Sequence, residues 1–220
     1  MKTNKKIYDE LGEGKHFLLT DYTENYELYV ENQKILNARK FNSTCNDHDQ
    51  IFSLIKNEVL MRNPNPTFGL CHGVRSGLEN KTLGEKLNCK VIGTEIGDKF
   101  GYPDITIQWD MHDIKEEWIG ACDVIYSNSF DHTYDPIHCL NQWAKTLKPT
   151  GIIVLQHGYR GGHYIPELVP NKKYSPGDPF NAPISVYHEI CDKYTPLRIT
   201  AVKNWYGNDA ELHLIIELKK

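Results

Sequence analysis

The feature that most constrains the fold of this chain is a series of short apolar segments, each bounded by turn residues, in the middle of the sequence. Five of them have the length and composition of buried strands, at residues 67–71, 90–96, 105–110, 122–127 and 151–157. Segments with helical spacing fit between most of these strands. Strands that are separated by helices pair in parallel through crossover connections. The pattern therefore predicts an α/β fold with a doubly wound, mostly parallel sheet and helices on both faces.

Both ends of the chain depart from this alternation. Residues 1–66 are expected to form an N-terminal extension and a first helix, and most of the extension is polar and aromatic with irregular periodicity. A predicted helix at 181–194 is followed by two apolar segments around a turn at 206–209, which predicts an antiparallel β-hairpin. We expect a single domain in which residues 67–220 form the core.

The composition limits the classes of partner. With 40% hydrophobic and 25% charged residues, the 220-residue chain has enough apolar material for one sizeable core. The formal net charge is −4 and the Lys and Arg residues are scattered, which argues against a nucleic-acid partner. The six cysteines are widely spaced, and no apolar run is long enough to span a membrane. We therefore expect reduced cysteines, no membrane partner and a cytoplasmic location.

A glycine-containing turn follows the first predicted strand. In the segment Leu-Cys-His-Gly-Val-Arg-Ser-Gly (70–77), Gly73 and Gly77 stand where the chain passes from strand to helix. Glycine permits a left-handed backbone and a close approach of the backbone to a ligand. Arg75 lies between the two glycines, and a guanidinium is suited to bind a carboxylate. By itself, such a turn is more typical of an ordinary strand-to-helix connection.

Polar residues end the next three predicted strands. Glu95 follows the glycine turn by about twenty residues, a spacing at which a carboxylate binds the ribose hydroxyls of an adenosine. Asp110 closes the third strand, and the segment 123–136 carries Asp131 and His132 beyond the fourth. The alternative interpretation of each is an ordinary polar residue at a strand end. Because parallel strands end at one edge of a sheet, we expect these side chains to converge there.

Taken in order, these segments resemble the class I (Rossmann-like) S-adenosylmethionine-dependent methyltransferases over residues 67–157 and, more loosely, in the terminal hairpin. The segment Leu-Lys-Pro-Thr-Gly-Ile-Ile-Val-Leu-Gln-His-Gly (147–158) is similar to the family's Leu-Lys-Pro-Gly-Gly turn and fifth strand. The glycine turn departs from the family pattern, because Cys71 replaces its usual acid and Arg75 its middle glycine.

The resemblance implies S-adenosylmethionine as the cofactor. It assigns the glycine turn to the methionine moiety, the acid of the second strand to the ribose, the end of the third strand to the adenine, and the residues after the fourth strand to the cofactor amino group. The implied cofactor-binding residues are Gly73, Arg75, Gly77, Glu95, Asp110, Met111, His112, Asn128 and Ser129.

The resemblance also implies in-line transfer of a methyl group, in which the protein positions the acceptor and removes its proton. The expected acceptor is a small molecule or a glycan, methylated on a hydroxyl oxygen. Histidine suits the role of base near neutral pH. His132 and His157 follow adjacent predicted strands, so we expect both at the cleft and His132 as the first candidate. Residues 157–181 are predicted to form a long loop that covers the acceptor.

A metal-assisted reaction is the weaker interpretation of the same region. Asp131, His132, His157 and His163 have metal-ligating side chains, but no tight ligand motif joins them. We therefore predict no metal.

Three other functions stay as alternatives. An NAD-dependent oxidoreductase would also use Glu95, but its Gly-x-Gly-x-x-Gly run is missing here. An aminopropyl transferase binds a decarboxylated relative of the cofactor, and Asp131 is compatible with that activity. A non-catalytic binding module would explain the irregular glycine turn, whereas Glu95 and Asp110 argue against it.

Overall fold

The computed structural model describes residues 5–13, 18–20, 22, 24–41, 48–158, 178–205 and 211–220. The helices in this part of the chain are α1 (Lys5–Gly12), α2 (Tyr26–Lys40), α3 (His48–Arg62), α4 (Leu78–Leu87), α5 (Pro136–Thr146) and α6 (Ile184–Tyr194), with two 3-10 turns, η1 (Glu116–Trp118) and η2 (Phe130–His132). The strands of the main sheet are β2 (Phe68–His72), β3 (Lys90–Glu95), β4 (Thr106–Gln108), β5 (Cys122–Ser127), β6 (Leu147–Gly158), β8 (Leu197–Lys203) and β9 (Glu211–Leu218). A small separate sheet pairs β1 (Leu18–Leu19) with β7 (Phe180–Asn181).

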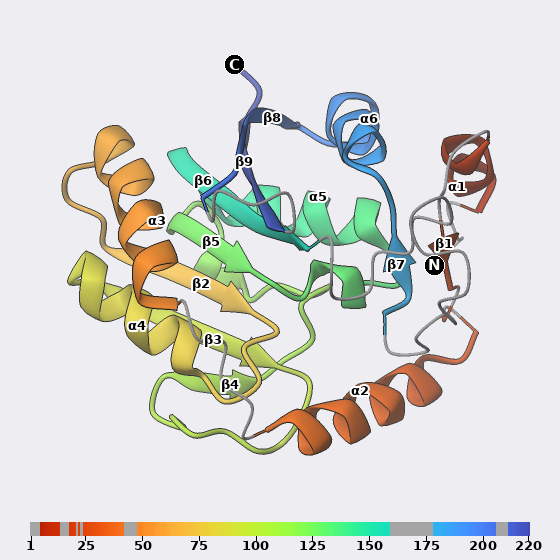
Figure 1. Cartoon of the computed structure of the whole chain (residues 1–220), viewed down its shortest axis with the longest axis horizontal. Coiled ribbons are helices and arrows are strands. Elements are labelled where there is room, and N and C mark those ends of the chain that lie inside the picture. Colours follow the sequence, from red (N-terminus) through yellow and green to blue (C-terminus); the bar gives the residue numbers. More distant parts are fainter. Residues whose placement is uncertain are drawn as a thin grey trace.

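The main sheet has the strand order β4-β3-β2-β5-β6-β9-β8 (Figure 1). The first five of these strands pair in parallel, whereas β9 is antiparallel to both β6 and β8. This topology confirms the predicted α/β class and the antiparallel pair at the C-terminal end. The chain builds the sheet outward in opposite directions from β2 and β5, and sheets of this type bind ligands at such a switch point.

β6 is longer than the fifth predicted strand because it begins before the expected turn. Its register with β5 shifts: Cys122 pairs with Leu147, whereas Val124 pairs with Ile152. Gly151 lies within this shift, and a Cβ atom there would lie 2.4 Å from the carbonyl oxygen of Cys122. A glycine is therefore required at this position of β6.

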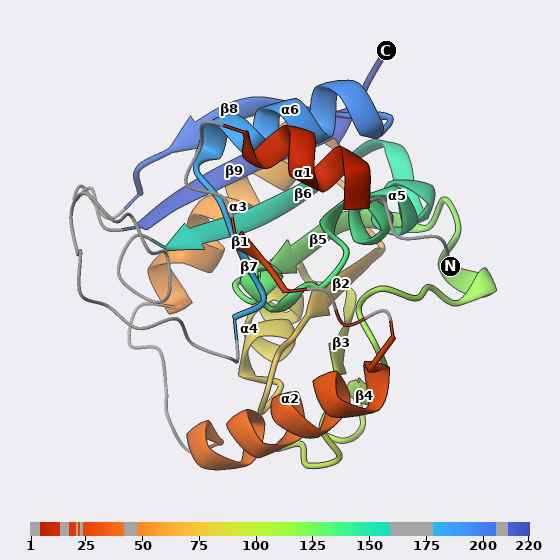
Figure 2. The same ribbon diagram turned by 90° about the vertical axis from the view of Figure 1, so that its right-hand side faces the viewer.

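Two hydrophobic cores lie on opposite faces of the sheet, because the side chains of a strand alternate between its faces. In β6, Ile152 and Val154 belong to the core that contains residues of α3 and α4. Ile153 and Leu155 belong to the core that contains Trp143 of α5 and residues of α1 and α6. The helices therefore enclose the sheet from both sides (Figures 1 and 2).

The N-terminal extension is attached to the core through α1 and the β1–β7 pair. α1 lies beside α6 (Figure 2). Tyr8 of α1 donates a hydrogen bond to the carboxylate of Asp135, which also accepts from the backbone N–H of His138 and so caps α5. Burial and the adjacent Asp135 raise the pKa of Tyr8 above its usual range, so the hydroxyl keeps its proton and stays a donor.

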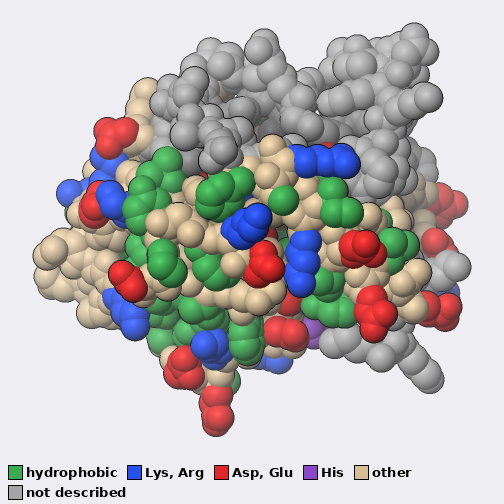
Figure 3. Space-filling view, turned by 90° about the horizontal axis from the view of Figure 1, so that it is seen from below, with side chains coloured by type: hydrophobic (Ala, Val, Ile, Leu, Met, Phe, Trp, Pro, Cys, Tyr) green, Lys and Arg blue, Asp and Glu red, His purple; other side chains and the backbone are tan. Residues whose placement is uncertain are grey.

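α2 lies near the ends of β2, β3 and β4 (Figure 1) and was not anticipated as a helix. The reason is its unusual pattern: the polar side chains Gln33 and Asn37 are buried, whereas Leu28 and Ile35 are more than 40% exposed. From the α2 side, hydrophobic side chains are interspersed with acidic and basic ones (Figure 3). A helix that buries polar residues gives no apolar periodicity from which to predict it.

Two expectations from composition concern the cysteines and membranes. The cysteines of the described residues are all free, and burial raises the pKa of the Cys71 and Cys139 thiols well above the usual value. These thiols are therefore protonated and act as small apolar side chains. Within the described ranges, no helix has both the length and the apolar character needed to cross a membrane.

Asp123 joins three segments at the amino end of the parallel strands. Its buried carboxylate accepts hydrogen bonds from the backbone N–H groups of Thr67 and Phe68 at 2.7 and 3.1 Å. The side chains of Asn63 and Lys148 each donate to it at 2.7 Å. Burial by itself would raise the pKa of Asp123, but these donors outweigh burial and hold the pKa below its usual value. The ionised carboxylate thus connects the starts of β2, β5 and β6.

Replacing Asp123 by alanine is expected to lower the free energy of unfolding by about 3 kcal/mol near pH 7, because Lys148 and the backbone donors lose a buried acceptor. The control Asp104→Ala removes an exposed carboxylate and should change stability by less than about 0.5 kcal/mol. Because the pKa of Asp123 is depressed in the fold, its contribution is present above the unfolded pKa of about 3.9 and is lost as the pH falls. Urea unfolding near pH 7 and near pH 3 measures both effects. A difference that does not shrink at the lower pH would contradict this account.

Glu79, in the first turn of α4, is a buried acid with incomplete pairing. Its Oε1 atom accepts from Asn128 Nδ2 at 3.5 Å, and its Oε2 atom has no hydrogen-bond partner among the described residues. Burial raises the pKa of Glu79 to about 7, although hydrogen bonds and the charge of Arg75 partly offset this effect. The ionised form therefore costs folding free energy at alkaline pH.

The variant Glu79→Gln is expected to be more stable than the wild type by up to about 3 kcal/mol near pH 8, and equally stable near pH 4. The sign follows from the raised pKa: the contribution of Glu79 is most favourable below its unfolded pKa and declines as the pH rises to about 7. Glu85→Gln, at an exposed position of the same helix, should show no such pH dependence. Thermal unfolding over this pH range measures the difference. An equal gain at both pH values would exclude the buried charge as its cause.

Candidate active site

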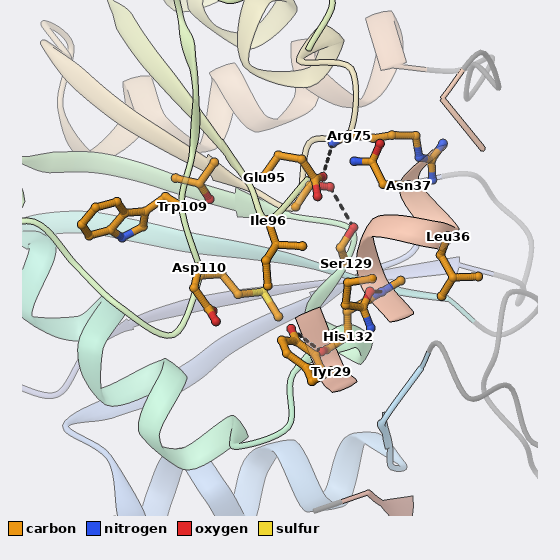
Figure 4. A pocket seen from close by; sticks show the side chains of 14 residues that line it. Tyr29, Leu36, Asn37, Arg75, Glu95, Ile96, Trp109, Asp110, Ser129 and His132 are labelled. Carbon is orange, nitrogen blue, oxygen red and sulfur yellow. Dashed lines mark hydrogen bonds between the residues drawn. The ribbon is translucent and has the colours of Figure 1, made fainter. Parts of the chain in front are cut away.

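A pocket lies at the carboxyl ends of β2, β3, β4 and β5, with α2 closing one side (Figure 4). The space between its lining residues, which is open to solvent, is about 590 Å³. The lining residues come from α2, from the end of β3 and from the segments that follow the four strands: Tyr29, Gln33, Leu36, Asn37, Gly73, Arg75, Thr94, Glu95, Ile96, Trp109, Asp110, Met111, Ser129 and His132. The predicted convergence of strand-end residues is thus what the structure shows for Glu95, Asp110 and His132.

Gln33, Leu36 and Asn37 of α2, which line the pocket, were not found from the sequence. Tyr29, Gln33, Leu36 and Asn37 are spaced by four, three and one positions, which places them on one face of a helix. The spacing itself was the available signal. This spacing predicts a buried helix face only if polar residues such as Gln33 and Asn37 are allowed to face inward.

The turn between β2 and α4 has the left-handed backbone that its glycines suggested. Gly73 and Gly77 have φ values of +72° and +88°, and Arg75 between them has φ +50°. A Cβ atom at Gly73 would lie 2.6 Å from Cβ of Ser129, so both backbone angle and space require glycine there. Arg75 adopts a conformation that is unfavourable for a residue with a side chain. Gly73 and Arg75 line the pocket, whereas Gly77 packs against Thr106 outside it.

Glu95 is held in place by the backbone of two neighbouring segments. Its Oε2 atom accepts from the N–H of Arg75 at 2.7 Å, and its Oε1 atom accepts from the N–H of Gly97 at 3.0 Å. The residue is 7% exposed and lines the pocket. Each carboxylate oxygen can accept more than one hydrogen bond. The carboxylate is therefore fixed in position and retains capacity for ligand hydroxyls.

Asp110 is positioned by His112 and by α2. Its Oδ1 atom accepts from the backbone N–H and the Nδ1 atom of His112 at 2.8 and 2.6 Å, and its Oδ2 atom accepts from the hydroxyl of Tyr26 at 2.7 Å. Burial would raise the pKa of Asp110, but the hydrogen bonds and charge of His112 outweigh burial and lower it. Asp110 is therefore an ionised acceptor in the pocket wall.

His112 lies behind Asp110 and does not line the pocket. Its ring stacks on Tyr134 at a centroid distance of 4.0 Å, and its Nε2 atom is 2.7 Å from the hydroxyl of Thr133. Its imidazole is thus used to orient Asp110. Met111, between the two, does line the pocket.

Asn128 and Ser129 follow β5 and differ in their exposure to the pocket. Ser129 lines it, and its hydroxyl is within hydrogen-bond distance of the carbonyl of Gly73 and of Asn128 Oδ1. Asn128 is outside the lining and contacts Glu79. The pair therefore fixes the loop after β5 against the glycine turn.

His132 lies at the pocket with its two ring nitrogens in different environments. Nδ1 is 2.6 Å from Oε1 of Gln33, an oxygen that only accepts, so Nδ1 carries the proton. Nε2 lies 3.6 Å from Asp178 Oδ1 and 3.9 Å from Asp131 Oδ1. In these three side chains, the atoms that could coordinate a metal ion lie within 4.8 Å of one another. The ring is therefore oriented by α2 and faces two carboxylates.

His157 does not line the pocket. It shares the strand face of Ile153 and Leu155, and its Nε2 atom lies 3.0 Å from the carbonyl oxygen of Ala182. Burial lowers its pKa, so the ring is neutral. Strand alternation was the available signal, since residues two apart point to the same face. His163, named only for the weaker metal-assisted interpretation, and residues 159–177 of the predicted loop lie outside the described residues.

Comparisons with known proteins bear on the fold. No family model matches the chain, and no curated protein matches it. Among solved structures, 1,6-didemethyltoxoflavin-N1-methyltransferase of Burkholderia thailandensis, with bound 1,6-didemethyltoxoflavin and S-adenosylhomocysteine, aligns with a TM-score of 0.66 at 9% identity, covering 93% of this chain and 95% of that one.

Two further structures agree with this similarity. The plantazolicin methyltransferase BpumL, in complex with S-adenosylhomocysteine, has a TM-score of 0.61 at 13% identity, with 89% of this chain and 97% of that one covered. The sugar N-methyltransferase KedS8 from Streptoalloteichus sp. has a TM-score of 0.56 at 12% identity, with 84% and 92% covered. Together with the strand order, these alignments show that this chain has the Rossmann-like fold of class I S-adenosylmethionine-dependent methyltransferases.

Proposed function

We propose that this protein transfers a methyl group from S-adenosylmethionine to an acceptor. The observation that carries the proposal is the convergence of Gly73, Glu95 and Asp110, from three separate strand ends, on one pocket in a methyltransferase fold. Each of them matches a position that was assigned from the sequence to a different part of the cofactor. Comparison proteins with the same fold were crystallised with S-adenosylhomocysteine, which supports this assignment.

The pocket residues fit the cofactor chemically. The carboxylate of Glu95 would accept from the ribose hydroxyls, and that of Asp110 would accept from the adenine amine, with Met111 beside the ring. Gly73 and Ser129 would approach the methionine moiety, and Arg75 is suited to pair with its carboxylate. When bound, the cofactor supplies a methyl group that its positive sulfur makes electrophilic.

His132 is the proposed base for a hydroxyl acceptor. With Nδ1–H donating to Gln33, Nε2 would be the ring atom that takes the acceptor's proton. The carboxylates of Asp131 and Asp178, 3.9 and 3.6 Å from Nε2, would stabilise the imidazolium that forms. Gln33 orients the ring in the manner of the third member of a catalytic triad.

The proposed acceptor is a small molecule or a glycan. Two of the comparison proteins carry N-methyltransferase in their names, so a screen for the acceptor should contain amines as well as alcohols and sugars.

Calorimetric titration is expected to show micromolar binding of S-adenosylmethionine and S-adenosylhomocysteine, and no comparable binding of NAD or decarboxylated S-adenosylmethionine. Glu95→Ala should weaken binding at least about tenfold, because the variant lacks the ribose acceptor. Glu85→Ala, which removes an exposed carboxylate of α4, is the matched control and should bind normally. Absence of binding by the wild type would refute the methyltransferase proposal and favour a non-catalytic module. Selective binding of NAD would favour the oxidoreductase.

His132→Ala is expected to bind S-adenosylhomocysteine nearly as the wild type does, while lowering turnover about a hundredfold. The measurement is transfer of a labelled methyl group to the best acceptor from the screen. His188→Ala, on α6 and outside the pocket, is the control. Unchanged turnover in His132→Ala would remove the base assignment without affecting the cofactor assignment.

A further inference from the structure

The pocket contains a buried hydrogen-bond donor that the protein does not use. Asn37 of α2 is 8% exposed and lines the pocket beside the residues proposed to bind the cofactor. Its amide nitrogen, Nδ2, is buried and has no hydrogen-bond partner among the described residues. Buried amide groups are nearly always paired, because an unpaired one loses its hydrogen bonds to water without replacement. A ligand in the pocket with a hydrogen-bond acceptor near Asn37 would satisfy this amide.

The other polar contacts of α2 make this exception more informative. Tyr26 donates to Asp110 at 2.7 Å, Tyr29 donates to the carbonyl of His132 at 3.1 Å, and Gln33 pairs with the His132 ring at 2.6 Å. Each of these α2 side chains is satisfied by a residue at or next to the pocket. Asn37 continues the same helix face and lines the pocket, but its amide nitrogen has no such partner among the described residues.

The position of Asn37 indicates which part of a ligand it would meet. A Cβ atom on Gly97 would lie 3.1 Å from Asn37 Nδ2, so the amide packs directly against Gly97. The N–H of Gly97 donates to Glu95. Figure 4 shows the Asn37 side chain, from α2, with its amide directed toward the carboxylate of Glu95, which comes from the end of β3. A donor and an acceptor thus face the same space without bonding to each other.

We propose that Asn37 is a specificity-determining residue that donates its amide hydrogen bond to a ribose hydroxyl of the cofactor, while that hydroxyl donates to Glu95. This inference rests on the proposed function. A hydroxyl is both donor and acceptor, so it satisfies the amide and the carboxylate together. A deoxyribose lacks that group and leaves Asn37 unpaired. The pair therefore selects a ribonucleoside over its deoxy analogue, and α2 completes the nucleoside site.

The test is calorimetric titration with S-adenosylhomocysteine and its 2′-deoxy and 3′-deoxy analogues. The wild type is compared with Asn37→Leu, which removes the amide, and with Asn37→Asp, which keeps the shape but replaces the donor by a charge near Glu95. Asn32→Leu, the same change outside the pocket lining of the same helix, is the matched control. Circular dichroism establishes that each variant is folded. If Asn37→Leu does not fold, Asn37→Asp carries the comparison.

We expect the Asn37 variants to bind S-adenosylhomocysteine about tenfold more weakly than the wild type, and Asn32→Leu to bind it normally. One deoxy analogue should bind the wild type about tenfold more weakly and lose no further affinity in the Asn37 variants, because the same hydrogen bond is already missing. Normal binding by folded Asn37 variants would overturn the inference. It would also be overturned if, for both deoxy analogues, the loss of affinity caused by the Asn37 substitution simply added to the loss caused by the missing hydroxyl. Failure of the wild type to bind S-adenosylhomocysteine would instead refute the proposed function, and this inference with it.

Discussion

The ends of β2 and β5 are held together by hydrogen bonds beyond those of the sheet, and the pocket depends on this contact. Ser127 donates to the carbonyl of His72 at 3.0 Å, and the Ser129 hydroxyl lies 3.1 Å from the carbonyl of Gly73. The absence of a side chain at Gly73 lets Ser129 come this close. The sheet is built in opposite directions from β2 and β5. The hydrogen bonds between the ends of these two strands therefore fix the part of the pocket that lies between them.

α2 belongs to the N-terminal extension and packs at this edge of the sheet. Its inward side chains are mostly polar, and they pair with Asp110 and His132 rather than with a hydrophobic core. The helix is therefore packed against the groups that are proposed to bind cofactor and acceptor. The same α2 side chains therefore hold the helix in place and position the groups proposed to bind the ligand.

Several predicted site residues do not line the pocket but contact residues that line it or lie close to it. His112 orients Asp110, Asn128 contacts Glu79, and Gly77 gives space to Thr106. Sequence position places such residues near the site but does not distinguish a side chain that faces the ligand from one that supports it. That distinction depends on rotamers and on the neighbouring loops. His157 differs, because strand alternation already directs it to the face of Ile153 and Leu155.

The sequence by itself determined the class of fold, the order of the parallel strands along the chain, the glycine turn and the acids at the strand ends. These features are local: periodicity, turn chemistry and spacing record them within a few residues. Only the tertiary structure decided that α2 closes the pocket, that Asn37 brings a buried, unpaired donor to it, and that Gln33 of α2 holds the His132 ring there. Those outcomes depend on contacts between segments distant in the chain, and a polar helix face that is buried only by such contacts leaves no hydrophobic pattern in the sequence.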